Sequence, residues 1–250
     1  MKNIVIIPAR LNSQRLPNKL LLQINNRFLF QIVYENISKS KLIDNLLIAT
    51  DSNEIANICK SLNFNYILTP GHFQSGTDRI EWANRQLNAQ YDLIINVQAD
   101  EPMLYGEDLD KFIEFISGKD FDVATIVTKI KISDEINDPN TVKVVLDNQN
   151  KAMYFSRAPI PFARDELISI DLAKDKYYKH IGIYAYKPEA LKKFAELPQS
   201  YYEKIEKLEQ LRLLSYGYNY LCYEIDKELI SVDTLKDFEI VKQILEKQIQ

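Results

Sequence analysis

The sequence predicts an α/β fold with a mostly parallel central sheet flanked by helices. Short apolar segments rich in β-branched residues, such as 3–8 (NIVIIP) and 91–97 (YDLIINV), recur through the first half of the chain, with helical patterns between them. Segments that are apolar at every position are typical of strands covered by helices on both faces. Because strand–helix–strand alternation connects parallel neighbours, we expect the sheet to be mostly parallel.

The elements of the first half follow in alternating order. Strands are expected at 3–8, 46–50, 66–69 and 91–97, and helices at about 27–40, 52–62 and 77–87. Asp51 or Ser52 is a candidate cap of the second of these helices, because short polar side chains accept hydrogen bonds from the first free backbone N–H groups. The polar segment 9–19 is expected to form a loop after the first strand.

The second half is less regular. Strands are expected at 123–129, 142–146, 181–186 and 220–224, with antiparallel pairing among the first three. Apolar residues at helical spacing predict a helix over 203–214, and Asp233 or Thr234 is expected to open the last helix. We find no linker or repeat, so a single domain over 1–250 is expected, with a regular half at about 1–120 and a second half at about 121–250.

Composition excludes several classes of function. The chain has 250 residues with 31 basic and 35 acidic side chains, a formal charge of −4, which does not favour a nucleic-acid or anionic-membrane partner. No apolar run is long enough for a transmembrane helix or a signal peptide. Cys59 and Cys222 lie far apart without metal-ligand spacing, so both are expected to be buried thiols in a reducing cytoplasm.

Glycine is scarce, with six residues in the chain. A dinucleotide-binding fingerprint needs three glycines within six positions, which this sequence does not contain. Gly71 and Gly76 have the spacing of a P-loop, but Thr77 and Asp78 follow where Lys and Ser or Thr are required. A nucleotide would therefore have to be bound largely by side chains.

The loop after the first strand carries three cations. Arg10, Arg15 and Lys19 lie within ten residues in the segment PARLNSQRLPNK, which contains no acidic residue. Forked guanidinium donors and an ammonium suit a triphosphate. The alternative is a solvated basic loop with scattered surface ion pairs.

Two further segments follow strand ends, where ligands bind in open α/β sheets. After the third strand comes QSGTDR, whose hydroxyl groups either contact a nucleotide or merely cap a helix through Ser75 or Thr77. After the fourth strand comes NVQADEP. Asp100 is there a candidate Mg²⁺ ligand, since Mg²⁺ takes one or two carboxylates together with phosphate oxygens, or it only accepts hydrogen bonds from loop amides.

Taken together, the motifs resemble those of the 3-deoxy-manno-octulosonate (Kdo) cytidylyltransferases, the CMP-Kdo synthetases. The match covers about residues 3–240, in the order PARLNSQRLPNK, QSGTDR, NVQADEP, NTVKVVLD, YFSRAPIP, HIGIYAY, KLEQLR and SVDT. The resemblance implies a nucleotidyltransferase fold of the glycosyltransferase-A type. It also implies that CTP and Kdo give CMP-Kdo and pyrophosphate, a step supplying lipopolysaccharide synthesis.

The resemblance assigns roles to individual residues. It places Arg10, Arg15 and Lys19 on the CTP phosphates and Asp100 and Asp233 on Mg²⁺, with two ions during catalysis. It places further residues in the nucleotide pocket, namely Pro8, Ala9, Gln74, Ser75 and Arg79. The second half would bind the sugar acid and form a homodimer. The residues around the sugar acid would be Gln98, Arg157, His180, Glu209 and Gln210.

The sequence departs from the family pattern at three positions. Ala99 stands where the family usually has glycine, which bears on the geometry of the metal or sugar site. Asn18 and Leu20 replace the usual glycine and proline around Lys19, so the path of this loop is expected to differ.

Other functions stay open at this point. CMP-sialic acid synthetases join CTP to a different 2-keto sugar acid, although the stretch from YFSRAPIP to KLEQLR matches the Kdo enzymes better. An 8-amino analogue of Kdo is a further candidate substrate. A catalytically silent nucleotide-binding protein is the alternative from another class, and the presence of both Asp100 and Asp233 argues against it.

Overall fold

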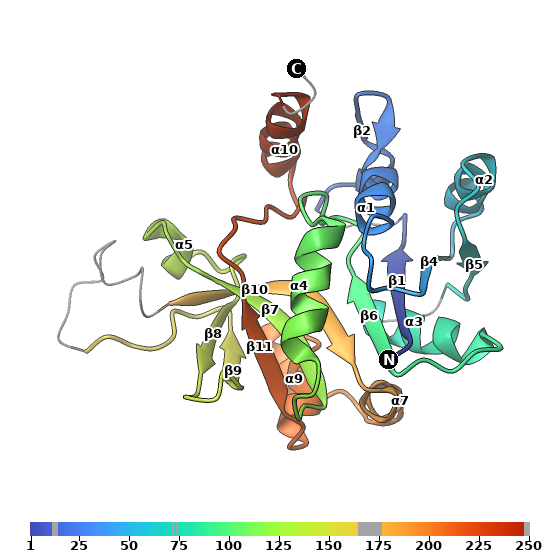
Figure 1. Cartoon of the computed structure of the whole chain (residues 1–250). Helices are drawn as coiled ribbons and strands as arrows, with labels where there is room; N and C mark the ends of the chain where they lie inside the picture. The colour runs from blue at the N-terminus through green and yellow to red at the C-terminus, as the bar shows by residue number, and fades with distance from the viewer. Residues whose placement is uncertain (12–14, 72, 74, 165–176, 248–250) are drawn as a thin grey trace. The chain divides into compact units, whose positions relative to one another are not determined.

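The computed structural model describes residues 1–11, 15–71, 73, 75–164 and 177–247. The chain divides into two compact units (Figure 1): unit 1 consists of Met1–Glu114 and Leu229–Gln250, and unit 2 of Phe115–Glu228. Within the described part of the chain, the helices are all too short or too polar to cross a membrane. The sequence places the change between halves near residue 120 and does not anticipate that the last helix returns to unit 1. The single-domain organisation stays a prediction.

Unit 1 contains a parallel sheet in the strand order β6-β1-β4-β5. Its strands are β1 (Asn3–Ala9), β4 (Asn45–Thr50), β5 (Tyr66–Leu68) and β6 (Leu93–Val97). β1 pairs in parallel with both β4 and β6, and every residue of β1 is buried. This burial explains why every residue of the strand after Asn3 is apolar.

Helices connect these strands: α1 (Leu29–Ile37) precedes β4, α2 (Asn53–Ser61) precedes β5 and α3 (Gly76–Gln86) precedes β6. α10 (Leu235–Lys247) returns to unit 1 after unit 2, and α4 (Gly106–Ile116) leads from unit 1 into unit 2. Ser52 caps α2 and Ser75 caps α3, each accepting a bond from a backbone N–H of the first turn. α3 packs against β1, β4 and β6, and α2 lies beside the edge strand β5 (Figure 1).

Unit 2 is built around mixed strand pairing. Its strands are β7 (Val123–Lys129), β8 (Lys143–Leu146), β9 (Ala152–Ser156), β10 (Tyr178–Tyr186) and β11 (Tyr220–Glu224). β10 pairs antiparallel with β7 and β8, β8 pairs antiparallel with β9, and β11 pairs in parallel with β7. The helices are α5 (Asp134–Asn137), α7 (Pro188–Glu196), α8 (Tyr201–Glu206) and α9 (Leu211–Ser215). The predicted α/β class with a mostly parallel sheet is confirmed, as is the antiparallel pairing in the second half.

Two predicted helices differ from the structure. The helix expected at 27–40 begins at Leu29, because 23–28 form a short hairpin of β2 (Gln23–Ile24) and β3 (Arg27–Phe28), with Asn25 and Asn26 at positive φ in its turn. The helix expected at 203–214 is broken into α8 and α9. Lys207 adopts the left-handed conformation, which ends α8.

The state of the cysteines follows the prediction, whereas three elements of the structure are not predicted by the sequence. Both cysteines are free and buried, as expected. The sequence did not indicate α4, α7 or β9. The first turn of α7 carries the usual signal of proline at the start of a helix, Pro188.

Candidate active site

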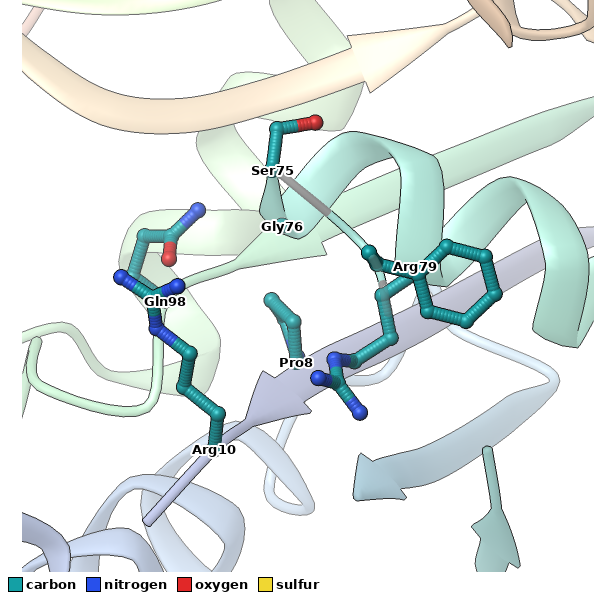
Figure 2. A pocket seen from close by; sticks show the side chains of 7 residues that line it. Pro8, Arg10, Ser75, Gly76, Arg79 and Gln98 are labelled. Carbon is teal, nitrogen blue, oxygen red and sulfur yellow. The ribbon is translucent and has the colours of Figure 1, made fainter. Parts of the chain in front are cut away.

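A cavity of about 140 Å³ opens in unit 1 at the carboxyl ends of β1 and β6. Figure 2 shows the side chains of Arg10, Gln98 and Arg79 arranged around Pro8. The lining residues are Pro8, Arg10, Phe73, Ser75, Gly76, Arg79 and Gln98. The cavity lies where ligands bind in open α/β sheets. It contains four of the residues assigned to the nucleotide, and also Gln98, which the resemblance assigns to the sugar acid.

Gly76 allows the first turn of α3 to approach the strand ends closely. A Cβ at this position would lie 3.3 Å from Pro8 Cγ and 3.4 Å from Gln98 Nε2. Any side chain would therefore press on two residues that line the cavity. Ala9 is fully buried within β1, and Gln74 lies outside the described residues.

Arg79 is held rigidly at the cavity wall. Its side chain is 3% exposed, its Nη2 pairs with Asp51 Oδ2 at 2.7 Å, and its Nη1 donates to Thr69 Oγ1. A buried guanidinium needs such partners because desolvation of an unpaired charge is costly. The sequence indicates Asp51 only as a candidate helix cap, a role that Ser52 takes in the structure. The missed signal is a carboxylate directly after a buried strand, the same pattern that indicated Asp100.

A second group of charges joins three distant segments of unit 1. Lys19 Nζ bonds to Asp100 Oδ2, to Asp233 Oδ1 at 3.0 Å and to the carbonyl oxygen of Val232 at 3.0 Å. Burial by itself lowers the pKa of Lys19, but the charges of Asp100 and Asp233 raise it above its usual value. Lys19 is therefore a fixed cation, with a side chain only 12% exposed, and not a solvated surface lysine.

The other two cations of the loop are more accessible. Arg15 is exposed and pairs with Asp233 through Nη2 and Oδ2 at 2.9 Å, while Arg10 is exposed at the cavity. Asp233 does not cap α10, because Thr234 Oγ1 accepts the N–H of Asp237 instead. The alternative interpretation of Asp233 as a helix cap is therefore wrong, and its carboxylate is free to face the cations.

Glu101 adds little negative charge to this group. Its side chain is buried, and Ser231 Oγ bonds to its Oε1. Burial, and then the charge of Asp100, raise the pKa of Glu101 to about 8. The raised pKa favours the neutral form of the Glu101 carboxyl.

The pair of aspartates fits a magnesium ion. Both carboxylates converge on one cation, the Lys19 ammonium, so the fold already brings them to a common positive charge. In the described parts of the chain no cluster of three or more His, Cys, Asp or Glu could bind a metal by itself. Two carboxylates without further protein ligands are typical of Mg²⁺ sites completed by substrate phosphates and water.

The remaining residues assigned to the sugar acid lie in unit 2. The Arg157 guanidinium is partly exposed and donates to three backbone carbonyl oxygens: Nε to Glu206 at 2.8 Å, Nη1 to Pro139 at 2.8 Å and Nη2 to Lys207 at 3.5 Å. Only the last of these bonds is long, so Nη2 retains most of its capacity to bind a ligand.

His180 is neutral in this environment. Desolvation lowers its pKa to about 3, and its Nε2 lies 2.8 Å from Thr125 Oγ1. The Thr125 hydroxyl donates to the carbonyl oxygen of Ile183 at 2.7 Å. Since a hydroxyl has one proton to donate, His180 Nε2 is assigned as the donor and Nδ1 as an acceptor.

The broken helix places Glu209 and Gln210 in the turn between α8 and α9. Gln210 is buried and accepts a bond from the Tyr184 hydroxyl through Oε1 at 3.2 Å, whereas Glu209 is partly exposed. The sequence predicts both residues within one continuous helix, beside the apolar stripe of Leu208 and Leu211. In the structure they lie instead in the turn that separates α8 from α9.

Comparisons with known proteins agree on the family. The cytidylyltransferase family model matches residues 4–230. A 3-deoxy-manno-octulosonate cytidylyltransferase of Chloroherpeton thalassium is 40% identical over 253 residues, covering 100% of both chains. One of Francisella tularensis subsp. holarctica is 44% identical over 248 residues, covering 98% of this chain and 99% of the relative.

Solved structures give the same result. A CMP:2-keto-3-deoxy-manno-octonic acid synthetase complexed with CTP has a TM-score of 0.90 and 34% identity, covering 99% of this chain and 100% of that one. A 4-diphosphocytidyl-2C-methyl-D-erythritol synthase from Anaerococcus prevotii, at 15% identity and a TM-score of 0.65 over 98% of this chain and 99% of that one, shares the fold alone. The chain belongs to the 3-deoxy-manno-octulosonate cytidylyltransferase family, as the resemblance in its sequence predicts.

Proposed function

We propose that this enzyme transfers the cytidylyl group of CTP to the anomeric hydroxyl of Kdo, giving CMP-Kdo and pyrophosphate for lipopolysaccharide synthesis. The observation that carries the proposal is the convergence of Lys19, Asp100 and Asp233 at the strand ends that also form the cavity. The names of the relatives and the CTP complex of the similar structure support the two substrates.

The cavity binds the nucleoside and the cationic loop binds the phosphates. Arg79, fixed by Asp51 and Thr69, presents a rigid donor to the nucleotide, and Ser75 adds a hydroxyl at the same wall. Arg10 and Arg15 are exposed and can turn toward the triphosphate, whose charge needs several donors. Lys19 supplies a third cation from the same loop.

Asp100 and Asp233 would hold Mg²⁺. An ion bound by these two carboxylates would supply Lewis-acid stabilisation of phosphate charge and would make a nearby hydroxyl group easier to deprotonate. The attacking sugar oxygen forms a bond to the α-phosphorus while the bond from the α-phosphorus to the oxygen bridging it to the β-phosphorus breaks. Pyrophosphate leaves with that oxygen, and the hydroxyl proton passes to solvent water. The protein contributes position and charge, and no covalent intermediate is needed.

The residues of unit 2 bind the sugar acid in this proposal. Arg157 offers Nη2 to the carboxylate, and His180 and Glu209 offer acceptors to sugar hydroxyl groups. Gln210 is buried and orders the turn beside Glu209. A neutral His180 suits this role because Kdo presents several hydroxyl donors.

We also propose a homodimer formed through unit 2. Apolar side chains of β9 and α8 are exposed, and the Tyr154 and Tyr202 rings pack edge to face with centroids 6.1 Å apart. The exposed members of this set are Met153, Tyr201, Tyr202 and Ile205. Size-exclusion chromatography with light scattering should give twice the chain mass of 29.2 kDa. The mass of a single chain at micromolar protein concentration would contradict the dimer.

The function is tested by measuring pyrophosphate release from CTP and Mg²⁺ with each of three acceptors. Kdo, 8-amino-Kdo and N-acetylneuraminate differ in the parts of the sugar that the Kdo and sialic acid enzymes must distinguish. We expect the highest kcat/KM with Kdo and the nucleotide product to be CMP-Kdo by mass spectrometry. A higher kcat/KM with N-acetylneuraminate would show that this sugar acid, and not Kdo, is the substrate. If no pyrophosphate is released with any acceptor, the result would favour a catalytically silent nucleotide-binding protein.

A further inference from the structure

Lys143 is a buried cation to which the sequence motif NTVKVVLD assigns no role. It lies in β8, is 0% exposed, and forms no ion pair with a carboxylate among the residues that the structure describes. Its Nζ donates to three backbone carbonyl oxygens, those of Asp138 at 2.8 Å, Thr141 at 2.6 Å and Arg157 at 2.7 Å. The three protons of the ammonium group are therefore all used.

Such a residue is costly for the fold. Removing an ammonium from water without a paired anion is unfavourable, and burial lowers the pKa of Lys143 accordingly. Apolar side chains often replace buried charges without loss of stability. A buried lysine at this position is explained if its ammonium group is needed to hold the three carbonyl groups in one arrangement.

Two of the carbonyl groups that Lys143 binds flank a partner of the Arg157 guanidinium, and the third belongs to Arg157 itself. The loop Asp138–Thr141 wraps around the ammonium, and the carbonyl of Pro139, within this loop, accepts Arg157 Nη1 at 2.8 Å. Lys143 also bonds to the carbonyl of Arg157 itself. It thus fixes both the backbone of Arg157 and one partner of its guanidinium.

Glu206 holds Arg157 from the other side. Its Oε2 accepts the Arg157 backbone N–H at 2.9 Å, its Oε1 accepts Ser156 Oγ at 2.6 Å, and its carbonyl accepts Arg157 Nε at 2.8 Å. Both peptide groups of Arg157 and two of its three guanidinium nitrogens are therefore held by short bonds. Nη2, with only a 3.5 Å contact, is the end left for a ligand.

We propose that Lys143 and Glu206 are positioning residues that orient Arg157 Nη2 toward the carboxylate of the sugar acid. This proposal rests on the proposed function, because it requires Arg157 to bind that carboxylate. An arginine with free torsion angles would lose conformational entropy on binding, whereas a pre-ordered one has already lost it on folding. The two residues therefore increase affinity for the sugar acid without touching it.

Steady-state kinetics of four variants test the proposal, each with CTP and the sugar acid varied in turn. Lys143→Met removes the charge and keeps the length, and Glu206→Gln is isosteric but cannot accept both bonds. Arg157→Lys tests the contact itself. Lys193→Met is the control, since Lys193 is an exposed lysine of unit 2 paired with Glu196. Melting temperatures are measured alongside.

We expect Lys143→Met and Glu206→Gln to raise the KM for the sugar acid about 10-fold or more, with kcat and the KM for CTP within about twofold. The control is expected to match the wild type. If Lys143→Met does not fold, Glu206→Gln carries the same prediction, because its shape is unchanged. An unaltered KM for the sugar acid in either folded variant would show a purely structural role and overturn the proposal.

Failure of the proposed function has a different signature. If the wild type uses another sugar acid, the KM values for that acid and for CTP are measured in the same variants. A rise in the KM for that acid alone would then support the positioning proposal, although the proposed substrate is wrong. If Arg157→Lys leaves the KM for the sugar acid unchanged while the wild type makes CMP-Kdo, the function stands and the positioning proposal is wrong.

Discussion

Lys19 is the residue on which the charge balance of unit 1 depends. The ammonium lies between the carboxylates of Asp100 and Asp233, Arg15 pairs with Asp233 as a second cation, and burial raises the pKa of Glu101 beside them. The sequence predicted the cation on a loop and both aspartates, but it could not show that they meet. The long, flexible side chain of a lysine can reach partners far away in the sequence, and local sequence patterns do not identify such partners.

Replacing Lys19 by methionine tests this role. We expect Lys19→Met to weaken CTP binding by about 10-fold or more, the loss of one charged hydrogen bond. Because its side chain is mostly buried between two carboxylates, the free energy of unfolding should also fall by about 1–3 kcal/mol, between the values for surface and buried pairs. Calorimetric titration with CTP and thermal unfolding measure the two effects.

The control for this experiment is again Lys193→Met, whose exposed ion pair with Glu196 is screened by solvent and should leave both CTP affinity and melting temperature close to those of the wild type. Wild-type affinity for CTP in Lys19→Met would show that Lys19 only joins the aspartates. An unchanged melting temperature would show that the contacts of Lys19 add nothing to folding.

At the scale of elements, most strands and helices of unit 1 follow from the sequence, because buried parallel strands are apolar throughout and their helices carry ordinary caps. The break between α8 and α9 does not. Residues 203–214 keep helical periodicity across it, and only the left-handed backbone of Lys207, with φ of 55°, interrupts the helix. Lysine is not a residue that predicts positive φ, so the sequence contains no sign of the break. The helical periodicity of 203–214 therefore predicts one helix where the structure has two.

Glycine substitutions test the break. Lys207→Gly is expected to keep the free energy of unfolding or to raise it by up to about 1 kcal/mol, since glycine adopts positive φ without strain. Lys204→Gly, one turn earlier within α8, should lower it by about 1 kcal/mol, or about 2–4 °C in melting temperature. Equal losses in the two variants would mean that Lys207 is helical in solution.

At the scale of the whole molecule, the chain returns to unit 1 after unit 2 is complete. Residues 229–247 bring Asp233 to the loop of Lys19 and to the end of β6, 133 positions from Asp100 (233 − 100). The backbone N–H of Val232 bonds to the carbonyl of Asp100 at 2.9 Å, which fixes this approach. Spacing within the sequence gave no reason to join the two aspartates, and the resemblance alone predicted it.

Cytidylyl transfer by the proposed mechanism requires Asp100 and Asp233 to act as one unit. A double-mutant cycle measures this, with Asp100→Asn, Asp233→Asn and the double variant compared by kcat for CMP-Kdo formation at saturating Mg²⁺. Each single variant should lose roughly 100-fold or more with a melting temperature within a few degrees of the wild type, and the double variant should be little worse than either. Losses that multiply independently, or an active Asp233→Asn enzyme, would contradict a shared role for the two carboxylates.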